Sequence, residues 1–103
     1  MGNDKNFGYL GNTFQIQLIN QLILNKDFAR SIVDVLDSKY FDNQYFKIIV
    51  QMIKEYYKKY ESVPSFDTLD QLTRSEISSE AARRIVHDTI TQIKDSNLEC
   101  HQF

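Results

Sequence analysis

Apolar residues recur every three or four positions along most of this chain, and the pattern is clearest over residues 44–60. The apolar stripe of that segment consists of Phe46, Ile49, Val50, Ile53, Tyr57 and Tyr60. Lysines occupy positions off the stripe, at Lys47, Lys54 and Lys58. This spacing predicts an amphipathic helix whose stripe faces a core. The helix should end before Pro64, because a proline ring cannot continue it.

The first predicted helix, over residues 14–26, has a less one-sided pattern. Its helical stripe consists of Phe14, Leu18, Leu22 and Ile23. Further apolar residues widen that stripe at Ile16, Ile19 and Leu24. A helix that is apolar on more than one side is either deeply buried or shared with a partner. Asn12 or Thr13 is the expected N-cap, because either side chain can accept a hydrogen bond from the first helical N–H groups.

A shorter segment lies between these two helices. Asp27 is expected to cap a second helix, and the predicted inner face consists of Phe28, Ile32, Val35 and Leu36. Residues 37–39 interrupt the helical pattern. The aromatic pair Tyr40 and Phe41 that follows predicts a plug for an apolar space. Asp42 or Asn43 then offers the cap for the helix over residues 44–60.

Two more helices are predicted in the last third of the chain. Ser65 can cap a fourth helix whose inner face is Phe66, Leu69 and Leu72. Ser78 or Ser79 can cap a fifth, with Glu80 in its first turn. The inner face expected for this helix is Ala82, Ile85, Val86, Thr89, Ile90 and Ile93. The pattern therefore predicts an all-α fold, a small orthogonal or antiparallel bundle of about five helices, over residues 12–96. Residues 1–11 are expected to form a flexible lead-in and residues 97–103 a tail.

Composition supports this picture and narrows the function. The 103 residues are 42% hydrophobic, enough for one core, and three glycines and one proline are too few for a turn-rich β fold. A formal net charge of −2 argues against a domain that depends on nucleic-acid phosphates. The single cysteine, Cys100, excludes an intrachain disulfide and suits a reducing cytoplasm. No apolar run is long enough to predict a membrane span, so no membrane partner is expected.

No residue constellation predicts catalysis, a metal or a cofactor. The glycines at Gly8 and Gly11 lack the lysine and the spacing of a phosphate-binding loop, so this chain is not expected to hydrolyse ATP. Imidazole and thiol ligands occur only at His87, Cys100 and His101, too scattered for a zinc site. The carboxylates Asp67 and Asp70 are expected to favour the helix dipole near a helix start.

A nucleic-acid contact is conceivable over residues 54–60. There the basic residues Lys54, Lys58 and Lys59 alternate with tyrosines, a combination that can follow and stack on a single strand. The simpler interpretation is a solvated helix face, since the lysines lie off the apolar stripe. A helix-turn-helix reader is weakly indicated, because the fifth helix carries Arg83 and Arg84 but few other base-reading side chains.

The order of these features resembles the N-terminal domain of DnaB-type replicative DNA helicases of bacteria and phages. The resemblance covers about residues 14–72. It rests on the apolar first helix, the Tyr40 and Phe41 pair, and the long helix with Ile49, Ile53 and Tyr57. Two further segments look closest to the phage branch, residues 37–41 (DSKYF) and residues 61–65 (ESVPS).

This resemblance implies a non-catalytic domain of a larger motor. In that family the ATP- and Mg-dependent motor domain follows in the same chain, so residues 97–103 are expected to be a tail or the start of a linker to it. The N-terminal domains form a collar on the hexameric ring, where primase docks. The expected partners are therefore primase and neighbouring helicase subunits, with DNA bound only through the full-length protein. The implied location is the cytoplasm of a bacterial or phage-infected cell.

Partner contacts are expected from apolar residues off the main stripe of each helix. These residues are Ile16, Leu24, Met52 and Tyr56. A few such anchors can dominate an interface. They could instead fill a second layer of the core, and for Met52 this is at least as reasonable. Two other functions remain open: a stand-alone helical module that binds single-stranded nucleic acid, and the helicase-binding domain of a primase.

Overall fold

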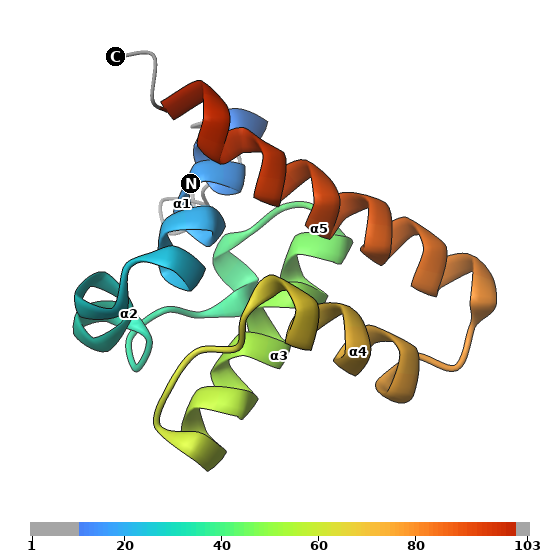
Figure 1. The fold of residues 1–103 in the computed structure, drawn as a ribbon, viewed down its shortest axis with the longest axis horizontal. Coiled ribbons are helices and arrows are strands. Elements are labelled where there is room, and N and C mark those ends of the chain that lie inside the picture. Colours follow the sequence, from blue (N-terminus) through green and yellow to red (C-terminus); the bar gives the residue numbers. More distant parts are fainter. Residues whose placement is uncertain (1–10, 101–103) are drawn as a thin grey trace, which may run out of the picture.

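The computed structural model describes residues 11–100, with side chains up to residue 96. Its helices are α1 (Asn12–Leu24), α2 (Lys26–Ile32), the 3-10 turn η2 (Ser38–Tyr40), α3 (Gln44–Tyr60), α4 (Phe66–Glu76) and α5 (Glu80–Cys100). No strand occurs among the described residues, which confirms the all-α class and the five-helix bundle. The long helix α5 packs against α1, α3 and α4 and runs along one side of the molecule (Figure 1).

Helix α3 is the central element of the core, and its bounds match the prediction. Its buried side chains are Phe46, Ile49, Val50, Met52 and Ile53. The predicted stripe was wrong at its end, because Tyr57 is only partly buried and the side chain of Tyr60 is 55% exposed. The last fully buried residue of α3 is Ile53, so the final two turns extend past the neighbouring helices.

Helix α1 buries only part of the predicted stripe, at Leu22 and Ile23. Phe14, expected inside, is 39% exposed, whereas Gln15 and Asn20 are buried. Asn20 Nδ2 donates a hydrogen bond of 3.0 Å to the carbonyl oxygen of Ile93 on α5. This bond satisfies a polar group that would otherwise be costly to bury, and it sets the rotation of α1 against α5.

The helix caps agree with prediction at three of five N-termini. The side chains of Asn43, Ser65 and Ser79 accept backbone N–H bonds at the starts of α3, α4 and α5. The other two caps were wrong. Helix α1 begins at Asn12 after Gly11, which has φ 90° and provides no side-chain bond. Helix α2 is capped by Asn25, which accepts from Phe28 N, because α1 ends there in extended backbone.

Besides Phe14 and Tyr60, two more residues predicted to face inward are exposed. Val35 is 71% exposed because α2 ends at Ile32, so the helical register no longer applies, and Val33 is buried in its place. Ile85 is 41% exposed because α5 packs against the core with Val86, Ile90 and Ile93, and Ile85 lies to the side of these residues. Elsewhere the aromatic plug is confirmed. Phe41 is fully buried, and its ring meets that of Phe46 edge-on, with centroids 6.5 Å apart.

The predicted domain limits are only partly covered by the described residues. The helical backbone of α5 continues to Cys100, four residues beyond the expected end of the domain at residue 96. The rest of the expected tail, residues 101–103, and the expected lead-in over residues 1–10 lie outside the described residues. No helix in the described part is long and apolar enough to cross a membrane.

Candidate docking surfaces

The four sequence-predicted partner residues divide into two pairs. Ile16 and Met52 belong to the core, with 7% and 5% of their surface exposed, which fits the alternative that they fill a second core layer. Both residues lie off the main stripe of their helices. Helix α5 packs against α1, and α4 and α5 pack against α3, so these two side chains are covered as well. Leu24 is 48% exposed and Tyr56 is partly buried, so these two remain accessible.

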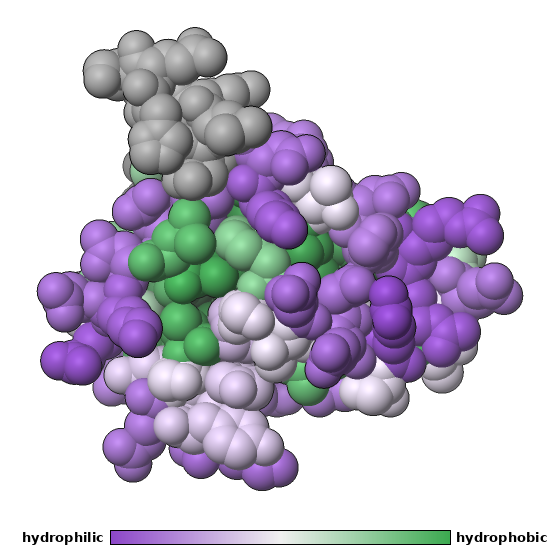
Figure 2. Space-filling view, in the orientation of Figure 1, coloured by the Kyte–Doolittle hydropathy of each residue, from purple (hydrophilic) through white to green (hydrophobic). Residues whose placement is uncertain are grey.

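Helix α1 keeps some apolar side chains accessible on its outer side, beside Gln17 and Gln21. Phe14 and Leu24 are exposed by 39% and 48%, and Leu18, one turn after Phe14, is partly buried. Figure 2 shows apolar surface gathered where α1 lies, within a face that is otherwise mostly hydrophilic. We call Phe14, Leu18 and Leu24 the α1 outer face. An apolar patch rimmed by polar residues is typical of an interaction site.

The end of α3 carries a second accessible group of aromatic side chains. The rings of Tyr56 and Tyr60 lie with their centroids 4.5 Å apart, and Lys59 Nζ lies 5.5 Å from the centre of the Tyr60 ring. We call Tyr56, Lys59 and Tyr60 the α3 tip. Aromatic side chains paired in this way are large and rigid, so a partner can bury them at little entropic cost.

The three lysines considered for nucleic-acid contact do not act as one group. Lys54 Nζ donates a hydrogen bond to the carbonyl oxygen of Leu36, which ties α3 to the segment after α2. One of the three donors of its ammonium group is thus used within the fold, and a nucleic-acid contact by Lys54 stays a prediction. Lys58 and Lys59 are exposed, but Glu55 and Glu61 flank this end of the helix.

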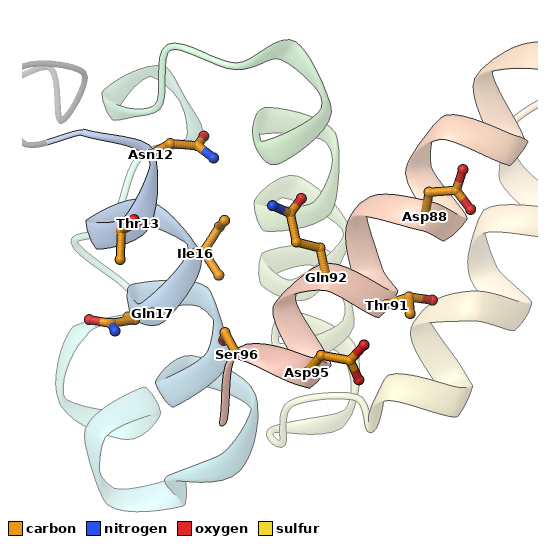
Figure 3. A pocket seen from close by; sticks show the side chains of 9 residues that line it. All are labelled: Asn12, Thr13, Ile16, Gln17, Asp88, Thr91, Gln92, Asp95 and Ser96. Carbon is orange, nitrogen blue, oxygen red and sulfur yellow. The ribbon is translucent and has the colours of Figure 1, made fainter. Parts of the chain in front are cut away.

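A cavity with a volume of about 530 Å³ lies between α1 and α5. Ile16, Thr13 and Gln17 line it from α1, and Gln92 and Ser96 are among the residues that line it from α5 (Figure 3). Its two carboxylates, Asp88 and Asp95, point away from α1 in Figure 3. They do not converge on a common point, so the cavity lacks the arrangement that acid–base catalysis requires.

An apolar groove of about 310 Å³ lies between α3 and the α4–α5 link. Ile48 and Met52 form its α3 side, and Ile77 forms the opposite side. Met52 thus touches an accessible groove although its own side chain is almost fully covered. The sequence pattern could not predict this groove, because it depends on how the α4–α5 link crosses α3.

Sequence reasoning missed one cluster of charged residues, on α4 and α5. His87 Nδ1 lies 2.6 Å from Asp70 Oδ1, and Arg74 Nη2 donates to Asp70 Oδ2 at 3.1 Å. Asp70, expected only to favour the helix dipole, thus joins two helices. Within the described residues no group of three or more histidine, cysteine, aspartate or glutamate side chains is arranged to hold a metal ion. The basic residues at the start of α5 were the available signal for this cluster.

Comparison with protein-family models, curated proteins and solved structures found no match to this chain.

Proposed function

We propose that this chain is the non-catalytic N-terminal domain of a DnaB-type replicative DNA helicase, which serves assembly of the hexameric ring and docking of primase. The observation that carries this proposal is the α1 outer face. Helix α1 packs on α5 and α2 with one side and still exposes Phe14 and Leu24 on the other. Exposed apolar side chains that share one helix are available to a protein partner.

The α3 tip supports the same proposal from a second place. Tyr56 and Tyr60 extend beyond Ile53, the last fully buried residue of α3. Tyrosine is among the residues that most often dominate protein interfaces. In this proposal the α1 outer face contacts a neighbouring subunit and the α3 tip contacts primase, and the parent protein uses ATP and Mg in a separate motor domain.

The reading frame of the parent gene gives the first test. A frame that continues past codon 103 into a glycine-rich phosphate loop ending in Lys-Ser or Lys-Thr is the expected result. A stop codon directly after Phe103 would contradict the helicase proposal. The chain would then be a free-standing adaptor or nucleic-acid module.

Titration against the primase encoded in the same genome tests the docking role. We expect Tyr56→Ala to weaken binding by about 1–2 kcal/mol, which is a factor of about 5 to 30 in Kd. Lys94→Ala is the matched control, because Lys94 is exposed on α5, away from both surfaces. Circular dichroism should show unchanged helicity in both variants. Equal affinities of wild type and Tyr56→Ala would remove the α3 tip from the primase surface.

Ring assembly of the full-length parent tests the α1 outer face separately. Leu24→Asp places a charge where the proposal requires an apolar contact, so sedimentation should show loss of hexamer at concentrations where the wild type is assembled. Thr91→Asp introduces the same charge at an exposed position of α5 and should leave assembly intact. An unchanged hexamer in Leu24→Asp would exclude Leu24 from the subunit interface.

A further inference from the structure

The cleft between α4 and α5 brings together three of the four arginines of the chain. It has a volume of about 290 Å³ and is open to solvent. Its basic side chains are Arg74, Arg83, Arg84 and His87. The two carboxylates of its lining are Asp70 and Glu80. Three guanidinium groups thus face two carboxylates, in a chain with a formal net charge of −2. We call these residues the α4–α5 basic cleft.

The bonding inside this cleft leaves two arginines without a carboxylate partner. Asp70 is already engaged, since its two oxygens bond Arg74 and His87. Arg83 reaches only the backbone carbonyl of Arg74, at 3.5 Å, and Arg84 forms no ion pair among the described residues. A guanidinium stays charged at every physiological pH and offers five N–H donors, so both arginines have unused binding capacity.

These arginines lie near the N-terminal end of the helix that carries them. Helix α5 begins at Glu80, so Arg83 and Arg84 are its fourth and fifth residues. The N-terminal end of a helix has a partial positive charge, which favours anions. An anion bound between α4 and the start of α5 would therefore lie close to both the guanidinium groups and this helix end.

We propose that the α4–α5 basic cleft binds the phosphodiester backbone of a nucleic acid. Phosphate oxygens match the fork of a guanidinium, and the N-terminal end of α5 adds a field that favours an anion. Neighbouring residues on a helix point in different directions, so Arg83 and Arg84 reach different phosphates. The cations therefore suit a chain of phosphates better than one small anion.

This inference does not rest on the helicase proposal. A nucleic acid would contact the start of α5, whereas the α1 outer face and the α3 tip are formed by other helices. It also places a nucleic-acid contact away from the end of α3, where the sequence suggested one and where Lys54 bonds the carbonyl of Leu36. Failure of one proposal leaves the other open to its own test.

Fluorescence anisotropy of a labelled oligothymidylate of about 20 nucleotides provides the test, with the 103-residue chain as titrant. The double variant Arg83→Ala/Arg84→Ala should raise Kd on the order of tenfold at about 50 mM salt. The slope of log Kd against log salt should fall by about 1.4 in this variant, because each phosphate contact on a single strand contributes about 0.7 to that slope. Arg83→Lys/Arg84→Lys keeps the charge and should retain most of the slope.

The matched control is Lys58→Ala/Lys59→Ala, which removes the same charge from the end of α3. It should change the salt slope far less than the arginine variant. Alanine is a good helix former, so circular dichroism should show all variants folded. Three outcomes would overturn the proposal: no binding of the oligothymidylate by wild type, an equal loss in the lysine variant, or equal competition by polyglutamate. The last would assign the cleft to an acidic protein.

Discussion

Helices α1 and α3 show how differently a sequence can specify the buried side of a helix. Both are rich in aliphatic residues, yet the inner face of α3 was predictable over its first three turns, whereas the prediction for α1 holds at Leu22 and Ile23 and fails at Phe14. Polar residues in α3 lie off one stripe, so only one rotation buries the apolar side chains. In α1 apolar residues occur on several sides, so several rotations bury a similar apolar area.

The rotation of α1 is selected by a polar contact with a distant part of the chain. Asn20 is fully buried and bonds the carbonyl of Ile93, which is 73 residues away. Burial of an amide is unfavourable without such a partner and acceptable with it. A local pattern contains no information about that partner, so it places Asn20 outside and Phe14 inside, contrary to the structure.

Ile53→Ala should give the largest loss of stability, and it tests the buried face of α3. Ile53 is fully buried, so the cavity left behind should cost about 2–5 kcal/mol in free energy of unfolding. Urea denaturation followed by circular dichroism measures this. Leu24→Ala on α1 is the control and should cost well under 1 kcal/mol, because Leu24 is 48% exposed. Similar losses in the two variants would contradict the assigned burial.

Asn20→Ala should have the next largest effect and tests the polar contact that orients α1. Loss of the buried amide removes the bond to Ile93 and leaves a small cavity, at a cost of about 1–3 kcal/mol. Gln17→Ala, on a partly exposed position of the same helix, should change stability by less than about 0.5 kcal/mol. If Asn20→Ala were as mild as Gln17→Ala, the rotation of α1 would depend on apolar packing alone.

Asn43→Ala should lower the free energy of unfolding by about 1 kcal/mol. It tests the difference between the capped N-terminus of α3 and the uncapped N-terminus of α1. Asn43 Oδ1 accepts from Tyr45 N at 2.7 Å and from Phe46 N at 3.4 Å, so alanine leaves both N–H groups without this acceptor. Helix α1 has no comparable cap, because Gly11 precedes it. Asn12→Ala should therefore be nearly neutral. A chemical denaturation series on both variants decides between these expectations.

Glu61→Gly should give the smallest effect, a gain of about 0.5 kcal/mol. Glu61 ends α3 in the left-handed conformation, with φ 59°, which a residue with a Cβ adopts at a cost. Glycine removes that cost but has more freedom in the unfolded chain, which offsets part of the gain. Thermal denaturation should show a small rise in Tm for Glu61→Gly and a small fall for Glu61→Val, whose branched side chain disfavours this conformation.

Sequence reasoning chose accessible residues in only two of its four predicted partner contacts. Leu24 and Tyr56 are accessible, as a residue off the apolar stripe of a helix is expected to be, and their contact role stays a prediction. Ile16 and Met52 satisfied the same rule and are buried, because other helices pack on those sides. The α4–α5 basic cleft was missed, since Asp70 and His87 are 17 positions apart and meet only through the packing of two helices.

The sequence by itself determined the fold class, the bounds of α3 and the side-chain caps at Asn43, Ser65 and Ser79. These features depend on periodicity and on hydrogen bonds between residues two or three positions apart. Only the tertiary structure decided the rotation of α1, the exposure of Tyr60 and the partners of Asp70 and Lys54. Each of these depends on which distant group lies opposite, and a distant group satisfies or excludes a side chain only after the helices have packed.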